Sequence, residues 1–162
     1  MKNKQTKYIS KEEGLAKLQK YCTYQDRCHQ EVRTKLINLG IYGDNLEEII
    51  SELIFDNFLN EERFARSFAR GKFRMRRWGR NRIVNELKFR KITDYCVRKA
   101  MTEIGDEEYI QILYEVIQKK KKHLIEKDPF KANNKIARYA ISRGFESEFV
   151  WQIIKEMQNE KS

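Results

Sequence analysis

The sequence contains a threefold internal repeat. Residues 32–53, 83–104 and 136–157 align without gaps over 22 residues, and apolar side chains coincide at six columns. Before and after a middle column, the apolar columns are three or four residues apart, which is the spacing of one helix face. Each copy is therefore predicted to be two helices joined by a turn. The columns are Val32/Ile83/Ile136, Leu36/Leu87/Ala140, Ile41/Ile92/Phe145, Leu46/Val97/Val150, Ile50/Met101/Ile154 and Leu53/Ile104/Met157.

A further helix is expected before each of these pairs. Ser10 and Glu13 have the spacing of a capping box, Asn60 is followed by two acidic residues, and a third start lies near Asp106. The predicted fold class is all-α, with three tandem three-helix, helix-turn-helix-like units over residues 10–58, 59–105 and 106–158. Units of this kind build an elongated body.

Glycines mark the expected turns in two of the three copies. Gly40 and Gly144 precede the middle column, where a left-handed residue would end a helix, whereas the middle copy has Lys91. Pro129 is the only proline and there are seven glycines, which argues against many short strands joined by turns.

Composition limits the possible location of the protein. The three cysteines are odd in number and follow no paired pattern, which fits a reducing compartment. The first 13 residues lack an apolar segment, and no stretch approaches the length of a membrane span. We therefore expect a cytoplasmic protein without membrane contact, acting as a monomer.

The positive charge is concentrated in the middle of the chain. The formal net charge is +10, yet residues 63–99 alone carry 14 Lys and Arg against two acids. The rest of the chain has 20 basic and 22 acidic residues. A charge concentrated in this way is typical of a surface that meets an anionic partner.

Five arginines are expected to form a row on the helix over residues 60–77. They are spaced by three and four residues, next to an apolar stripe of Phe64, Phe68, Gly71, Met75 and Trp78. Like charges at this spacing repel, and an anion would relieve that repulsion. Salt bridges to the acidic outer units, or a solvated face, are the alternative explanations of the row. The density of arginine favours contacts with phosphates or carboxylates over mere solubility, and we expect a bound anionic ligand. The candidate nucleic-acid- or protein-binding residues are Arg63, Arg66, Arg70, Lys72, Arg74, Arg77, Arg80, Arg82, Lys88, Arg90 and Lys91.

The lysine run Lys119–Lys122 is a second basic feature. Four consecutive lysines point around the whole helix, so solvation explains many of them, and cations also suit a helix C-terminus. A phosphate or acidic-partner contact is the alternative.

No catalytic motif is present. The sequence lacks the phosphate-loop, dinucleotide-binding, zinc-protease and serine-hydrolase patterns, and His29 and His123 have no convincing catalytic partners. Cys22, Cys28 and His29 are too few for a zinc site, so Cys22 is expected in the core and Cys28 at a helix entry. We predict a non-enzymatic protein with no catalytic residues, no metal and no cofactor.

Four sequence segments resemble the RecX family, over about residues 10–157. They are Leu59-Asn-Glu-Glu-Arg-Phe-Ala-Arg66, Arg77-Trp-Gly-Arg-Asn-Arg-Ile-Val-Asn-Glu-Leu87, Glu31-Val-Arg-Thr-Lys-Leu36 and Arg138-Tyr-Ala-Ile-Ser-Arg-Gly-Phe145. The resemblance implies that the three-helix units form a curved, elongated body. It also implies a regulator of homologous recombination, DNA repair and the SOS response. Such a regulator lodges in the groove of the RecA filament on DNA and modulates RecA, mainly by inhibition.

The resemblance also implies which positions act. Arg70, Arg74, Arg77, Arg80 and Lys88 would carry the activity on a concave face, with RecA and single- or double-stranded DNA as partners. Two departures stand out: Cys28 replaces a common Ser, so that Asp26 would cap the second helix, and Ala140 replaces a common Leu.

A helix-turn-helix protein that binds DNA or RNA without RecA is the alternative function. It would need a helix that reads bases. Glu47, Glu48 and Glu52 make that helix acidic in the first unit, which argues against sequence-specific reading there.

Overall fold

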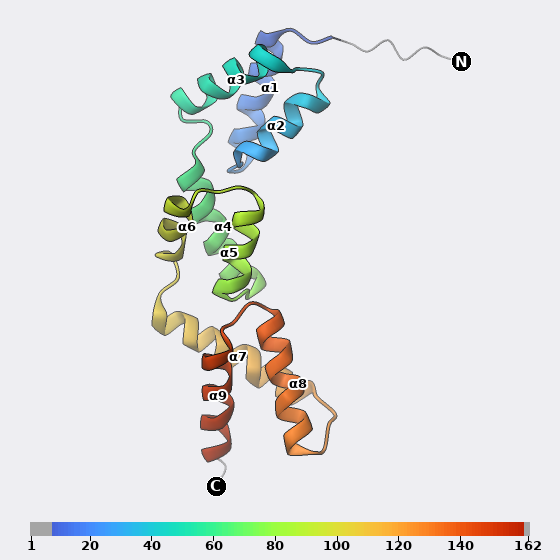
Figure 1. The fold of residues 1–162 in the computed structure, drawn as a ribbon, viewed down its shortest axis with the longest axis vertical. Coiled ribbons are helices and arrows are strands. Elements are labelled where there is room, and N and C mark those ends of the chain that lie inside the picture. The colour runs from blue at the N-terminus through green and yellow to red at the C-terminus, as the bar shows by residue number, and fades with distance from the viewer. Residues whose placement is uncertain (1–7, 161–162) are drawn as a thin grey trace, which may run out of the picture.

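Nine helices within residues 8–160 form an elongated body. The computed structural model describes residues 8–160, and within that range it contains helices and no strand (Figure 1). The predicted all-α repeat fold is confirmed. The helices are α1 (Lys11–Tyr24), α2 (His29–Asn38), α3 (Gly43–Phe55), α4 (Glu61–Arg76), α5 (Arg80–Phe89), α6 (Asp94–Met101), α7 (Asp106–His123), α8 (Pro129–Ser142) and α9 (Ser147–Asn159).

The helices pack chiefly in consecutive triplets, which we call unit 1 (α1–α3), unit 2 (α4–α6) and unit 3 (α7–α9). Figure 1 shows the units following one another along the long axis, with α1–α3 at one end and α9 at the other. The predicted boundaries after residues 58 and 105 fall in the α3–α4 and α6–α7 connections. As limits of independent domains they stay a prediction.

The repeat columns form the core. Every residue of the six columns is buried except Met101, which is partly buried. The middle column, Ile41, Ile92 and Phe145, lies in the turns between the second and third helices of each unit. Apolar side chains recurring on one face thus bring each pair of helices together.

The buried side chains fall into two clusters. One lies within unit 1, around Leu18, Leu36 and Leu53. The other runs continuously through units 2 and 3, from Phe64 to Met157. Cys28, at the start of α2, is the unit 1 residue that joins the larger cluster among the described residues. Units 2 and 3 therefore share one core, and unit 1 has its own.

The predicted apolar stripe of α4 was partly wrong. Met75 is 84% exposed, and the buried residues that replace it are Ala65, Ala69 and Phe73, spaced by four residues. Ala65 and Ala69 are fully buried, and α6 packs closely against α4. In α7, Tyr109 and Val116 are buried, whereas Ile110 is 39% exposed.

The helix starts mostly follow the sequence signals. The side chains of Ser10 and Asn60 accept hydrogen bonds from backbone N–H groups of α1 and α4. The expected cap of α2 was wrong. Asp26 binds Arg63 instead, and the cap residue is Cys28, whose backbone N–H and thiol both point to the Glu31 carboxylate.

The three turns adopt the expected left-handed backbone. The φ angles are 82° at Gly40, 102° at Gly144 and 58° at Lys91, so the middle unit makes the same turn with a residue that tolerates it poorly.

Backbone contacts join unit 2 to unit 3. The N–H groups of Gly79 and Asn81, at the start of α5, donate to the carbonyls of Arg143 and Gly144, at the end of α8. One helix end thus satisfies the unpaired groups of another. The buried Tyr109 adds to this junction: its hydroxyl accepts from the Arg80 N–H and donates to Glu146.

Candidate nucleic-acid interface

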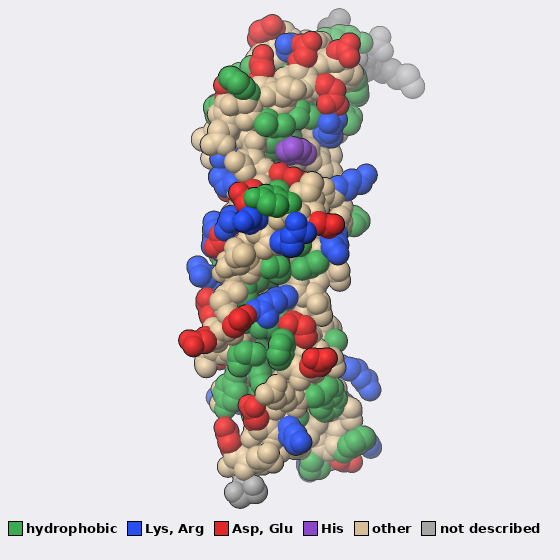
Figure 2. All heavy atoms as spheres, turned by 60° about the vertical axis from the view of Figure 1, so that its left-hand side comes forward, with side chains coloured by type: hydrophobic (Ala, Val, Ile, Leu, Met, Phe, Trp, Pro, Cys, Tyr) green, Lys and Arg blue, Asp and Glu red, His purple; other side chains and the backbone are tan. Residues whose placement is uncertain are grey.

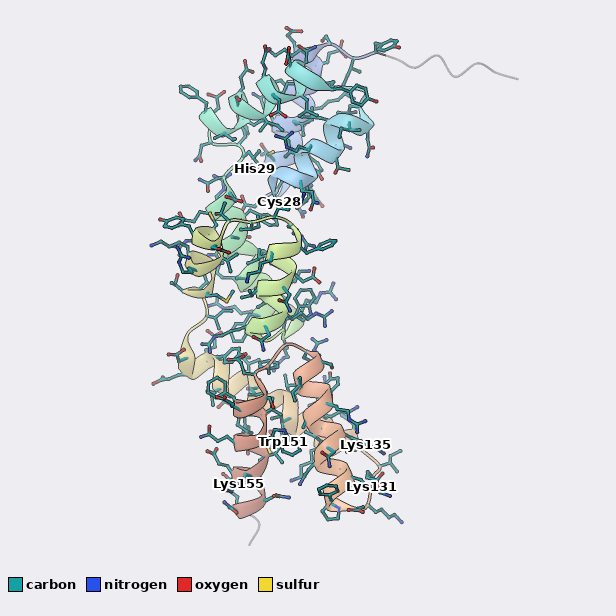
Figure 3. The ribbon with its side chains drawn as sticks, viewed as in Figure 1. Cys28, His29, Lys131, Lys135, Trp151 and Lys155 are labelled. Carbon is teal, nitrogen blue, oxygen red and sulfur yellow. The ribbon has the colours of Figure 1, made fainter. Side chains whose placement is uncertain are left out.

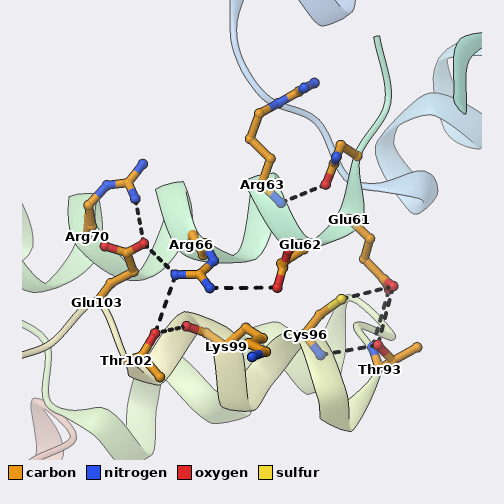
Figure 4. Close-up of polar contacts among 11 residues, drawn as sticks. Glu61, Glu62, Arg63, Arg66, Arg70, Thr93, Cys96, Lys99, Thr102 and Glu103 are labelled. Carbon is orange, nitrogen blue, oxygen red and sulfur yellow. Dashed lines mark hydrogen bonds and ion pairs between the residues drawn. The ribbon is translucent and has the colours of Figure 1, made fainter. Parts of the chain in front are cut away.

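The arginine row of α4 meets carboxylates in the folded chain. Arg63 binds Asp26 of unit 1 at 2.7 Å, and Glu103, just after α6, lies 2.9 Å from Arg66 and 3.0 Å from Arg70 (Figure 4). The two guanidinium groups hold the pKa of Glu103 below its usual value. This part of the row is already neutralised within the molecule.

The C-terminal part of the row contacts unit 3. Arg74 lies 3.4 Å from Glu108 and Arg77 lies 2.7 Å from Glu115, both on α7. Arg80 lies 2.7 Å from Asp106 and 3.6 Å from Glu146. The sequence left salt bridges, a solvated face and an anionic ligand as explanations of the arginines. In the folded chain, all six of these arginines form ion pairs with carboxylates. An anionic ligand here would have to displace a carboxylate.

Figure 2 shows how charged side chains are distributed on one face of the molecule. Acidic and basic side chains are interspersed along its length and no broad area of one sign appears. This face therefore carries no uniformly basic surface.

A second set of cations has no carboxylate partner within the described part of the chain. Four of the predicted residues belong to it. Arg76 also belongs to it, although it was not predicted, because it lies outside the row of five arginines. Within residues 63–91 the set is Lys72, Arg76, Arg82, Lys88 and Lys91. Arg90, by contrast, pairs with Glu86 on its own helix at 2.8 Å.

Three basic residues of unit 2 open onto a groove between units 1 and 2, which we call the basic groove. Its volume is about 800 Å³, and Lys72, Arg76 and Arg90 lie along it, opposite Lys35 of α2. Its two acidic residues bind arginines: Asp26 pairs with Arg63, and Glu31 lies 3.6 Å from Arg27. The other lining residues are Tyr21, Gln25, Gln30, Thr34, Asn38, Phe64, Ser67, Phe68, Gly71, Met75 and Phe89.

Aromatic rings position the cations beside the groove. Lys72 Nζ lies 5.0 Å from the centre of the Trp78 ring, and the Arg82 guanidinium lies 4.1 Å from the same centre. Arg90 lies 4.8 Å from the centre of Phe68. Such contacts hold a cation in place without neutralising its charge.

The groove also exposes apolar surface. Met75 is 84% exposed and Phe89 is 76% exposed, although both line it. Cations for phosphates and exposed side chains for bases are the combination that single-stranded nucleic acid requires. Met75 was predicted in the core and Lys35 was not predicted at all. Only the contact between units 1 and 2 brings them together.

Lys88 and Lys91 do not line the groove. They are exposed on α5 and in the turn after it. Cys28 and His29 lie where unit 1 adjoins unit 2 (Figure 3).

Within residues 8–160 no cluster of three or more His, Cys, Asp or Glu residues could hold a metal ion, and no helix is long and apolar enough to cross a membrane.

Fold and surface together define a basic protein of tandem three-helix units. The chain matches the family models for the second three-helix domain of RecX over residues 60–101 and the third over residues 106–154. The chain belongs to the RecX family.

Similar proteins agree with this assignment. The chain is 24% identical over 141 residues to "Regulatory protein RecX" of Bacillus cereus, which covers 87% of this chain and 52% of that protein. It is 24% identical to the protein of the same name from Clostridium tetani, over 96% of this chain and 72% of the relative. The crystal structure of RecX from Lactobacillus salivarius superposes with a TM-score of 0.81 and 25% identity, over 91% of this chain and 96% of that one. The chain spans about half the length of the Bacillus relatives it matches.

Proposed function

We propose that the protein binds the RecA filament on DNA and modulates RecA activity, mainly by inhibition. Membership of a family of regulatory proteins supports a regulatory role, and the elongated body suits a ligand that is itself extended. We further propose that it acts in the cytoplasm as a monomer and without catalysis of its own.

We place the contact with the anionic filament at the basic groove and the adjoining Arg82. The observation that supports this choice is the charge pairing: Lys72, Arg76 and Arg82 have no carboxylate partner among the described residues, whereas Arg66, Arg70, Arg74 and Arg77 do. A cation without a partner gains a full interaction when a phosphate arrives, but a paired one must first lose its carboxylate. The paired row of α4 then serves to hold unit 2 against unit 3.

RecA-driven ATP hydrolysis on single-stranded DNA tests both parts of the proposal. The protein is titrated into the reaction, together with the triple variant Lys72→Gln/Arg76→Gln/Arg82→Gln. The control Lys17→Gln/Lys20→Gln/Lys155→Gln removes the same charge from exposed positions on α1 and α9. We expect inhibition by the wild type and the control, and a concentration for half-inhibition at least about tenfold higher for the groove variant.

Two results would contradict the proposal. If the wild type fails to inhibit at near-filament stoichiometry, regulation of RecA is wrong. If the groove variant inhibits as well as the control does, the groove is the wrong surface. The variant Arg70→Gln/Arg74→Gln/Arg77→Gln, measured alongside, shows whether the paired row acts instead.

Nucleic-acid binding without RecA is the second candidate function. The exposed Phe89 and Met75 beside unpaired cations favour it, since they suit a single strand. It predicts binding of DNA or RNA in the absence of RecA, and inhibition of RecA only while the protein is in excess over the single-stranded DNA. The hydrolysis experiment, repeated with excess single-stranded DNA, therefore separates the two.

A further inference from the structure

A second basic pocket lies at unit 3, and its lining residues differ from those of the basic groove. Its volume is about 290 Å³, and it lies between the C-terminal half of α7 and the end of α8. The lining residues are Arg77, Glu115, Val116, Lys119, Lys120, His123, Tyr139 and Arg143. Two members of the lysine run, Lys119 and Lys120, thus face a defined cavity.

The charge inside this pocket is almost entirely positive. Glu115 is its one carboxylate among the lining residues, and that carboxylate binds Arg77 at 2.7 Å. Lys119, Lys120 and Arg143 have no ion pair in the described part of the chain. Three lysine and arginine charges therefore converge on one small cavity without a counter-ion from the protein.

The protein holds two of these cations in place. The Arg143 guanidinium donates a hydrogen bond to the backbone carbonyl of Arg76, and Lys120 Nζ lies 4.8 Å from the centre of the Tyr139 ring. Arg143 follows α8, whose end is bound to the start of α5 through Gly79. A pocket with positioned donors loses less entropy on binding than a set of free lysines does.

We propose that this pocket binds phosphate groups. A phosphate offers several acceptor oxygens to the converging ammonium and guanidinium donors, and the cavity is too small for a duplex or a folded partner. The phosphate comes from one of two sources, a free polyphosphate or the backbone of a single strand that reaches unit 3. The site uses residues distinct from the basic groove and does not depend on RecA.

Binding of sodium pyrophosphate and of a fluorescent oligothymidylate, measured by calorimetry and by anisotropy, tests the proposal. The variant Lys119→Gln/Lys120→Gln is compared with Lys127→Gln/Lys131→Gln, which removes the same charge from exposed positions of unit 3. We expect the pocket variant to bind about tenfold or more weakly than the control, because two charged hydrogen bonds are lost.

The two probes identify the source. If the pocket variant binds pyrophosphate more weakly than the control does, the source of the phosphate is a free polyphosphate. If only its binding of the oligothymidylate is weaker, the source is the backbone of a single strand. If neither probe binds, or if both variants bind each probe equally, the proposal is wrong. Since RecA is absent from the assay, these results are independent of the hydrolysis experiment.

Discussion

The backbone N–H of Gly79 donates a 2.8 Å hydrogen bond to the carbonyl oxygen of Arg143. The two glycines of this junction, Gly79 and Gly144, are so close that a Cβ on either would overlap the other's backbone. The bond therefore depends on the absence of side chains at both positions.

Replacing Gly144 with alanine is expected to destabilise the protein by about 2 kcal/mol or more, from left-handed strain and overlap with Arg82 together. Gly40→Ala is the control, because Gly40 has the same left-handed backbone with open space around it. It should cost only the strain, about 1 kcal/mol. Urea denaturation measures both, and equal losses would show that the junction contributes nothing.

Tyr109→Phe is expected to cost about 1–2 kcal/mol. The change leaves the Arg80 N–H and the Glu146 carboxylate without the hydroxyl that joins them, in a part-buried position. Tyr114→Phe on the same helix removes a hydroxyl that has no such bonds. If the two variants unfold at the same urea concentration, the Tyr109 hydroxyl does not stabilise the junction.

Stability should fall in acid partly through Glu103. Arg66 and Arg70 lower its pKa below the usual 4.5, so its ion pairs contribute fully above that value and are lost as the pH falls through the lowered one. The pair is near the surface, so the effect is below about 1 kcal/mol. Glu103→Gln should reduce the loss of unfolding free energy between neutral and acidic pH, whereas the unpaired Glu107→Gln should leave it unchanged.

The three cysteines should react slowly with thiol reagents in the folded protein. All are buried, and burial raises the pKa of each thiol, that of Cys28 to about 11. Little thiolate is therefore present at mildly alkaline pH. Labelling with an aromatic disulfide reagent should be slow without denaturant and fast in it. Rapid labelling of the folded chain would contradict the burial described above.

Affinity for single-stranded DNA should depend on salt through the groove cations. If Lys72, Arg76 and Arg82 each neutralise a phosphate, their triple Gln variant should flatten the slope of log affinity against log salt by about 2. The Lys17/Lys20/Lys155 control should keep the wild-type slope. Identical slopes for the two variants would exclude phosphate contacts at the groove.

Most helix faces were predictable from the sequence, whereas the individual charge partners were not. The columns that include Leu36, Leu87 and Ala140 mark the core because local periodicity dictates which side of a helix is apolar. The partners of Arg66 and Arg77 are carboxylates 37 and 38 residues away, which only the packing of α4 against α6 and α7 brings near. The burial of Phe73 was not predicted for a different reason. The other residues of its face are alanines, which carry no strong apolar signal.

The two separate cores give the molecule unequal resistance to a pull along its length. Units 2 and 3 are joined by backbone hydrogen bonds and a continuous apolar interior. Unit 1 is attached through the Arg63–Asp26 pair, Cys28 and the connecting chain. Under tension the first separation is therefore expected between α3 and α4, which would widen the basic groove while the rest of the body stays folded.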